Sequence, residues 1–220
     1  MRSLGAFSYD GMLVRFLNLV ADLVALHVLW LLCSLPIVTI GASTTALYYA
    51  CMKRIRTDED HVHTNFLRAF RSNFKQATVI WLMLAGAALL LLLDFRIGMA
   101  LEGPVGTFVL ISCAIPLIPF LLTSLYIFPV LAKFENPIVL NLKNALIMSL
   151  HNFPFTLLLV VIVLTFALAA VSFIPFTGLC ILCGAGIYGY FTSGIFIQVF
   201  RRYLPNELEE DFEKTDLYHH

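Results

Sequence analysis

The sequence predicts an all-α integral membrane protein, with six transmembrane helices arranged as three helical hairpins and both termini in the cytoplasm. Three observations lead to this prediction: the composition, a weak internal repeat and the distribution of basic residues. The chain has 220 residues, of which 60% are hydrophobic and 13% charged, and its mean hydropathy is +0.89. A soluble domain of this length needs more charge to cover its surface, so we expect the chain to lie in a bilayer.

The apolar runs are long enough to cross a hydrocarbon core, which takes about 20 helical residues. The first run is too long for the apolar region of a signal peptide and has no small-x-small cleavage site, so we expect an uncleaved first span. All spans belong to a single transmembrane domain, residues 1–203. The predicted spans are 13–34, 37–54, 77–95, 107–133, 155–173 and 176–200.

The hairpin arrangement comes from the internal repeat. Each unit begins with an Asn and a large apolar residue, runs apolar to a proline, continues with two small hydroxyl residues and an aromatic, and ends on a base. This order of features predicts a helical hairpin whose turn lies near the proline. The prolines of the three units are Pro36, Pro116 and Pro175.

The segment "LPIVTIGASTTALYYACMKRIR" is the most polar of the predicted spans. Pro36 suits the first turn of a helix, where its missing N–H costs nothing. The small residues of 41–46 would let this helix approach its neighbours closely, as packing in lipid favours. We therefore interpret residues 37–54 as the second arm of the first hairpin.

The basic residues give an independent test of the topology. With six spans, every Lys and Arg except Arg96 lies on the side of the two termini. This skew matches the positive-inside rule, and it puts both ends in the cytoplasm. Models with five or four spans remain as alternatives.

The segment "TNFLRAFRSNFKQ", residues 64–76, predicts an amphipathic basic helix. Its phenylalanines recur every four residues on one face, and its bases lie on the opposite face. Such a helix would lie at the headgroup level as a connector, or would offer a docking face to a cytoplasmic partner. The bases of this candidate face are Arg68, Arg71 and Lys75.

Two groups of residues invite a metal interpretation, and we favour neither. The Cys180-x-x-Cys183 pair lies in a Gly-rich span without a second pair, so we expect packing residues there. The loop 57–63 holds acids and two histidines, but a flexible loop lacks the fixed geometry of a metal site. We expect no metal, no cofactor and no nucleic-acid partner.

The segment 204–220 is an acidic cytoplasmic tail with six acids and one base. Leu204, Leu208 and Phe212 recur every four residues, so the tail can form a short amphipathic helix. Two states remain open for it: folded back on the basic surface near Arg68 and Arg71, or solvated and frayed.

Ionisable and hydroxyl residues inside spans are the candidate polar site of this chain. Asp22 pairs locally with Arg15, or belongs with His27, Thr44 and Thr45 to a route for a small solute. No Ser/His/Asp grouping, HExxH motif or phosphate-binding loop is present in the sequence, so we expect no enzyme.

The stretches "SLPIVTIGASTTALYYACMKRIRTDED" and "FLRAFRSNFKQAT" resemble the signature of the YesL family of bacterial membrane proteins. His27 stands where this family leads us to expect an amide residue such as Asn. The resemblance implies a multi-pass protein of the cell membrane of Gram-positive bacteria, without an established biochemical activity.

The resemblance also implies a function, because genes of this family often lie beside binding-protein-dependent oligosaccharide importers. We therefore expect a non-catalytic accessory subunit that contacts the lipid bilayer and the permease or ATPase subunits of a carbohydrate ABC importer. The alternative is a small transporter or channel, stand-alone or oligomeric. These hypotheses differ in one feature, since a transporter needs its polar residues to converge on a cavity.

Overall fold

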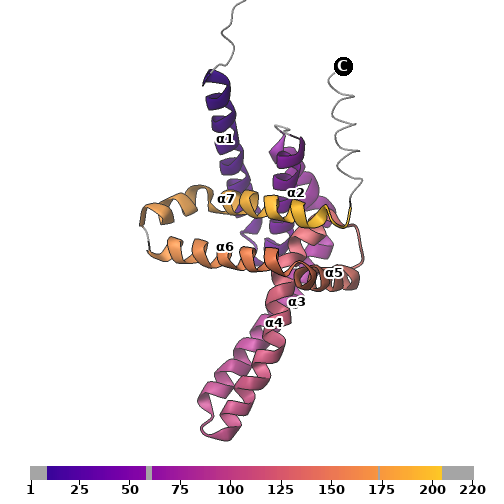
Figure 1. The fold of residues 1–220 in the computed structure, drawn as a ribbon, viewed down its shortest axis with the longest axis vertical. Coiled ribbons are helices and arrows are strands. Elements are labelled where there is room, and N and C mark those ends of the chain that lie inside the picture. The colour runs from indigo at the N-terminus through magenta and orange to yellow at the C-terminus, as the bar shows by residue number, and fades with distance from the viewer. Residues whose placement is uncertain (1–8, 58–60, 173, 205–220) are drawn as a thin grey trace, which may run out of the picture.

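A computed structural model describes residues 9–57, 61–172 and 174–204. This part of the chain is helical throughout and contains no strand, which confirms the all-α prediction (Figure 1). The elements are α1 (Tyr9–Ser34), the 3-10 turn η1 (Ile37–Thr39), α2 (Ile40–Thr57), α3 (Val62–Ala100), α4 (Pro104–Lys133), α5 (Ile138–His151), α6 (Phe153–Ser172) and α7 (Ile174–Phe200).

Within the described residues, five helices are long and apolar enough to cross a membrane: α1, α3, α4, α6 and α7. Helix α2, the second of the predicted spans, is not among them. It lies between α1, α3, α4 and α7 (Figure 1), and most of its residues are buried. A helix that neighbouring helices shield from lipid needs little hydropathy of its own, which explains its polar sequence.

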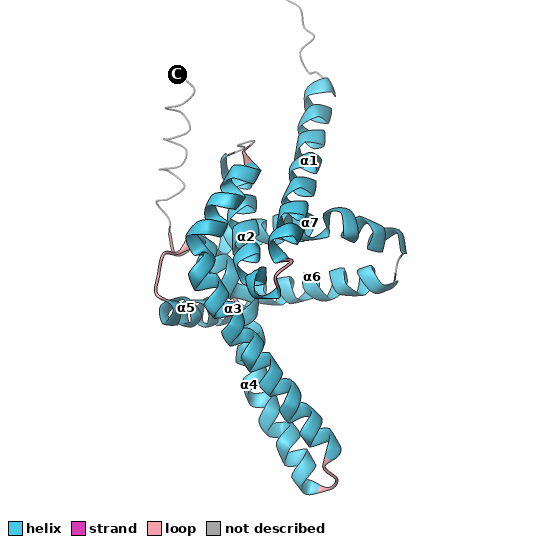
Figure 2. Cartoon of the chain, turned by 180° about the vertical axis from the view of Figure 1, so that it is seen from behind, coloured by secondary structure: helices cyan, strands magenta, loops and turns pink. Residues whose placement is uncertain are grey.

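Helices α3 and α4 pair with each other, as do α6 and α7, whereas α1 packs mainly on α7 and α2 mainly on α3. The α3–α4 and α6–α7 pairs are antiparallel hairpins that leave the centre of the molecule in clearly different directions (Figures 1 and 2). The centre consists of α2 together with the parts of α3, α4 and α7 that pack on it. In the outer half of each hairpin, the main neighbour of each helix is the other helix of the same hairpin.

Helix α3 differs from the sequence prediction, which had an amphipathic helix over 64–76 and a separate span over 77–95. The structure runs both through one helix of 39 residues. No glycine or proline separates the two predicted elements, so the backbone continues without interruption.

The turn of the second hairpin lies in the connection between the predicted spans 77–95 and 107–133, but not near Pro116, where the internal repeat put it. It occupies residues 101–103, where Gly103 has a φ of 81°, a conformation that favours glycine. Pro116 lies inside α4 instead of at the turn. Membrane helices tolerate such prolines because neighbouring groups can satisfy the carbonyl that loses its partner.

Helix α5 was not predicted, because residues 134–153 were interpreted as a connection. Its buried residues are Asn141, Ala145, Met148 and Ser149, at spacings of four, three and one. This is the pattern of an amphipathic helix, so the signal was present in the sequence.

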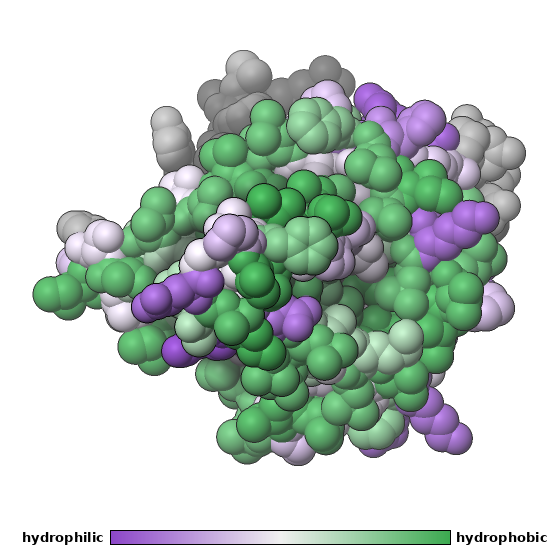
Figure 3. Space-filling model, turned by 90° about the horizontal axis from the view of Figure 1, so that it is seen from below, coloured by the Kyte–Doolittle hydropathy of each residue, from purple (hydrophilic) through white to green (hydrophobic). Residues whose placement is uncertain are grey.

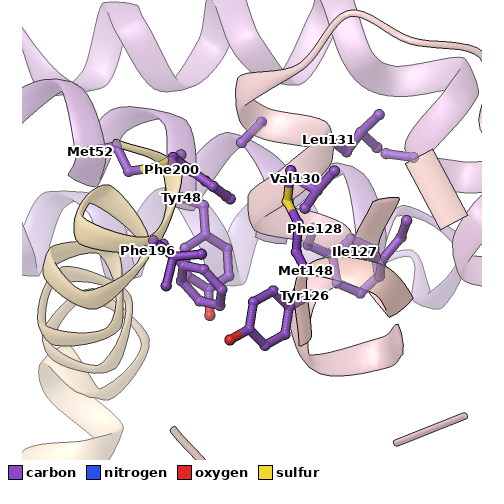
Figure 4. Packing of buried hydrophobic residues seen from close by; sticks show 14 of the residues in the cluster. Tyr48, Met52, Tyr126, Ile127, Phe128, Val130, Leu131, Met148, Phe196 and Phe200 are labelled. Atoms are coloured by element: carbon purple, nitrogen blue, oxygen red, sulfur yellow. The ribbon is translucent and has the colours of Figure 1, made fainter. Parts of the chain in front are cut away.

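Aromatic side chains join the centre of the molecule. The ring of Phe196 from α7 meets the rings of Tyr126 from α4 and Tyr48 from α2 edge to face, with centroids 5.1 and 5.7 Å apart (Figure 4). All three side chains are buried. This geometry is favourable for aromatic pairs, and it ties three helices together.

Helix α2 packs closely because its residues are small. A Cβ atom added to Gly41 would lie 2.6 Å from Cβ of Trp81 and 2.7 Å from the carbonyl oxygen of Ala77, both on α3. Ala42, Ser43 and Ala46 are fully buried. The small residues therefore bring α2 against its neighbours, as their composition predicted.

The surface of the hairpins is apolar. Large hydrophobic side chains such as Leu90, Phe108, Ile115 and Val171 are more than half exposed. Figure 3, which views the molecule from the tip of the α3–α4 hairpin, shows a mostly hydrophobic face with small separate hydrophilic groups. Such a surface suits contact with lipid or with another membrane protein.

Candidate functional site

His27 of α1 bonds with both ring nitrogens to the backbone of α7. Its Nδ1 accepts a hydrogen bond from the N–H of Ala185 at 3.0 Å, and its Nε2 lies 2.9 Å from the carbonyl oxygen of Ile181. Because Nδ1 is the acceptor, the proton of the neutral ring is on Nε2, which donates to Ile181. The side chain is 5% exposed.

These two backbone groups are the pair that an unbroken α-helix would join to each other. Between them lies Cys183, whose φ of −150° and ψ of 15° are not helical, so α7 is kinked there. Sharp kinks occur where a side chain inserts into the ladder of helical hydrogen bonds. The imidazole of His27 is thus a joint that supports the kink of α7.

Gly186 lets the two helices come close enough for this joint. A Cβ atom at this position would collide with the backbone carbonyl of Leu23, one turn before His27 on α1. Only glycine allows such an approach between two backbones. The Gly-rich part of the last span therefore serves helix contact at this point.

Asp22 forms its ion pair with a helix other than its own. Its Oδ2 accepts a hydrogen bond from Nε of Arg54 on α2 at 2.8 Å, and the two side chains are 16% and 9% exposed. The sequence offered Arg15 as a local partner, but the described structure gives no such bond. The pair joins α1 to α2, which is the least costly arrangement for charges in low dielectric.

Thr44 and Thr45 each satisfy their hydroxyl groups within the helical bundle. Thr44 accepts a hydrogen bond from the indole N–H of Trp30 at 3.2 Å. Thr45 donates to the backbone oxygen of Gly41 at 2.9 Å, one turn earlier on α2, and it is fully buried.

The four predicted polar residues have four different hydrogen-bond partners, although His27 and Thr44 both contact Trp30. Asp22 bonds to Arg54, His27 to α7, Thr44 to Trp30 and Thr45 to its own helix. Of the four, His27 lines a cavity, of about 590 Å³ between α1, α6 and α7. Asp22, Thr44 and Thr45 are not among the residues that line this cavity.

The bases Arg68, Arg71 and Lys75 lie exposed along one side of α3. The opposite face packs into the protein, because Val62, Phe66 and Ala69 are buried against α1 and α2. The sequence interpretation had the phenylalanines in the acyl layer of the membrane. Of the three phenylalanines in this segment, Phe66 is buried, Phe70 is partly buried and Phe74 is exposed, at 38%.

The groups that invited a metal interpretation give no cluster among the described residues. Cys180 and Cys183 are both free, and the Cys183 thiol faces the carbonyl oxygen of Leu179 at 3.4 Å. Asp58, Glu59 and Asp60 lie outside the described residues, as does the acidic tail from 205 onwards.

The sequence interpretation missed a polar network between α4, α5 and α6. Tyr126 and Thr156 share a hydrogen bond of 2.8 Å, and Thr156 also donates to the backbone oxygen of Ser149 at 2.6 Å. Nearby, Asn152 accepts from Arg202 and donates to Tyr203, both at 3.0 Å. The Asn of the third repeat unit gave a signal for this site, since a buried amide needs partners.

The fold and these contacts define a class: an all-helical membrane protein whose buried polar side chains join one helix to another. Comparison with known proteins shows which members of this class the chain is similar to. The family model described as "Protein of unknown function, DUF624" matches residues 23–95. That region contains all of α2 and three of the four predicted polar residues, His27, Thr44 and Thr45; Asp22 lies one residue before its start.

The "Uncharacterized protein YesL" of Bacillus subtilis (strain 168) is 32% identical over 125 residues, which is 55% of this chain and 58% of that relative. The match thus spans little more than half of the relative's length. No solved structure gives a significant match. Over the part of the chain that they match, the family model and this relative support the resemblance to the YesL family.

Proposed function

We propose that this chain is a non-catalytic membrane protein that acts by docking on a membrane partner. The partner we propose is the permease, with its ATPase, of a binding-protein-dependent importer of oligosaccharides. The docking role rests on the geometry, whereas the identity of the partner rests on the resemblance to the YesL family alone.

The docking role rests on one observation: the polar side chains inside the protein are hydrogen-bonded to other protein groups. A route for a polar solute needs side chains that face a common space near the middle of the membrane. Here both nitrogens of His27 bond to α7, Asp22 bonds to Arg54, and Thr45 bonds to Gly41. The bonds of His27 and Asp22 join two helices and that of Thr45 lies within α2, and a solute would have to break these bonds to use the groups.

A surface for the partner is available on the α3–α4 hairpin. A Cβ atom added to Gly86 would meet nothing within 4 Å, and its neighbour Ala85 is exposed as well. Small exposed residues let a second helix approach closely, which is the main source of helix association in lipid.

We also propose that the chain lies in the plasma membrane and crosses it six times. Both termini would then lie in the cytoplasm. Helix α2 has 18 residues, a length of about 27 Å at about 1.5 Å per residue, close to the thickness of the hydrocarbon core. The distribution of the bases supports this orientation.

A small transporter is the second candidate, and the cavity beside His27 is the observation that favours it. The cavity, of about 590 Å³, is lined by apolar and aromatic side chains including Trp30, Phe166 and Tyr188. Such a lining suits an apolar molecule, so this candidate would carry a hydrophobic solute and not a sugar.

The docking role is tested by photo-crosslinking in the native host. A benzophenone amino acid at position 86 of α3 lies on the proposed docking surface, and the same residue at position 151, an exposed histidine at the end of α5, is the control. We expect a covalent adduct with a permease subunit from position 86 and none from position 151. Identical adducts from both positions, or lipid adducts alone from position 86, would contradict the docking role.

A further inference from the structure

The cavity beside His27 is formed by three helices. Helix α7 packs on both α1 and α6, and residues of all three helices line the cavity. Figures 1 and 2 show α1 and the α6–α7 hairpin leaving the centre of the molecule in different directions. The volume of about 590 Å³ is within the range of sites that hold small molecules.

The kink of α7 shapes one wall of this cavity. The lining residues of α7 lie on both sides of Cys183, where the backbone is not helical. Gly184 follows directly and has no side chain, and Ala185 carries only a methyl group. The space therefore follows from the path of the α7 backbone and from small residues, and does not depend on the rotamer of one side chain.

The cavity opens on the surface that would face lipid. Leu31, Ala167 and Ile181 line it and are exposed, Ile181 by 69%. They belong to α1, α6 and α7, which are all long and apolar enough to cross a membrane. A ligand would therefore enter from the acyl layer of the bilayer, not from water.

The polar atoms of the lining already have protein groups beside them. Both ring nitrogens of His27 bond to α7, and the indole N–H of Trp30 donates to Thr44. The hydroxyl of Tyr188 lies close to a tyrosine hydroxyl of α2. The thiol of Cys180 is free, but a thiol is a weak donor and acceptor. The described lining, which holds no Lys, Arg, Asp or Glu, therefore suits a neutral molecule that needs few hydrogen bonds.

Aromatic rings from all three helices line the cavity: Trp30 from α1, Phe166 from α6 and Tyr188 from α7. The ring centroid of Phe166 lies 5.7 Å from that of Tyr188 and 5.3 Å from that of Phe176. The ring of Trp30 is stacked 6.4 Å from that of His27. These neighbours orient the rings in advance, which lowers the cost of binding.

We propose that this cavity binds a neutral, membrane-soluble molecule that carries a planar aromatic ring. The ring would lie among Trp30, Phe166 and Tyr188, because aromatic rings attract each other beyond the effect of burying their surface. A polar or flexible part of the molecule would stay at the opening, in the lipid.

The acyl chain of a lipid is the other occupant that could enter from the bilayer. It is flexible, so fixing it in the cavity costs conformational entropy that a rigid ring does not lose. It also has no ring to pair with the aromatic side chains. The aromatic lining therefore favours the ring compound.

The proposal goes beyond both candidate functions. It does not need the docking role, because the cavity lies on α1, α6 and α7 and the proposed docking surface lies on the α3–α4 hairpin. It does not need transport either, because a molecule can bind here without crossing the membrane.

The test measures tryptophan fluorescence of the full-length Trp81→Phe protein in a mild detergent. The chain has two tryptophans, so Trp30 in the cavity lining is then the sole one. The probes are 1-bromonaphthalene and 1-bromodecane, which have equal numbers of carbon atoms and both carry a bromine that quenches tryptophan on contact. We expect quenching by 1-bromonaphthalene to saturate, with a half-saturating concentration at least about ten-fold below that of 1-bromodecane.

Two results with these probes would overturn the proposal. Quenching that rises with concentration without saturating would show that the compounds only partition into the micelle. Binding of 1-bromodecane as tight as that of 1-bromonaphthalene would show that the cavity accepts any apolar chain.

Substitutions in the Trp81→Phe protein locate the site. Ala167→Phe places a ring in the opening and should weaken the binding of 1-bromonaphthalene at least about ten-fold. The matched control is Leu168→Phe, at the next position of α6, which is exposed and not in the cavity lining. Unchanged binding in a folded Ala167→Phe protein, or an equal loss in Leu168→Phe, overturns the assignment.

Phe166→Leu separates ring stacking from apolar burial, because it removes the ring and keeps an apolar side chain. It should weaken the binding of 1-bromonaphthalene about three-fold or more and leave that of 1-bromodecane unchanged. An equal loss for both probes would mean that Phe166 supports the fold without contacting the bound ring, and would contradict the proposed preference for an aromatic ligand.

Discussion

The joint between α1 and α7 predicts how His27 responds to substitution. His27→Ala removes two hydrogen bonds, to Ala185 and Ile181. Side-chain hydrogen bonds between membrane helices contribute about 0.6 kcal/mol on average and at most about 1.7 kcal/mol. We therefore expect His27→Ala to lower the free energy of unfolding by about 1–3 kcal/mol.

His27→Asn should restore most of this loss. A carboxamide carries one acceptor and one donor group, so it can accept from one backbone N–H and donate to one carbonyl as the imidazole does. This is also the type of residue that the resemblance to the YesL family leads us to expect at position 27. Thr44→Val, which removes one bond, from Trp30, is the matched control.

The assay is reversible unfolding in mixed micelles of a mild detergent and dodecyl sulfate, followed by tryptophan fluorescence. Trp30 reports on the joint directly, because its ring is stacked 6.4 Å from that of His27. If His27→Ala is as stable as the wild type, or if His27→Asn loses as much as His27→Ala, the imidazole is not a joint and the reasoning fails.

Two further predictions concern neighbouring contacts. Gly186→Ala places a methyl group against the carbonyl of Leu23 and should lower the free energy of unfolding by about 2 kcal/mol. Gly194→Ala is the control, because a Cβ atom there meets nothing within 4 Å, and it should change the free energy of unfolding little. Equal effects of the two substitutions would mean that α1 and α7 do not touch at Gly186. Asp22→Ala should lower the free energy of unfolding by about 1.5–3 kcal/mol because it removes the charge-assisted hydrogen bond from Arg54. In a double-mutant cycle with Arg54→Met, the losses should not add, and strict additivity would show that the pair is not coupled.

The sequence predicted the all-helical class and the presence of several long apolar helices, because hydropathy depends on which residues face lipid. Helix α2 shows where this signal ends. It is short and polar, with Ser43 and Thr45 fully buried; its small residues predicted close packing on its neighbours, but neither they nor its hydropathy predicted its place at the centre. The boundaries of α3 and the helix α5 were missed because charged or polar residues in them were interpreted as connections.

The contacts of the polar residues could not be predicted from the sequence. Asp22 and Arg54 are 32 positions apart, and His27 meets residues more than 150 positions away. Such contacts depend on how the helices pack, which local spacing does not encode. The sequence also offers Arg15 as a partner for Asp22, seven positions away on the same helix, and nothing in the local spacing points to Arg54 instead.

That the buried polar residues are joints and not the lining of a solute route is tested most directly by thiol labelling in intact membranes. Thr44→Cys and Thr45→Cys would be exposed to a membrane-impermeant maleimide from each side, with the labelled position identified by peptide mass spectrometry. Ser72→Cys, on the exposed side of α3, is the positive control. The joints predict labelling at position 72 and none at 44 or 45. Rapid labelling at 44 or 45 would mean that water reaches the centre of the helices, and would contradict the proposed role in favour of transport.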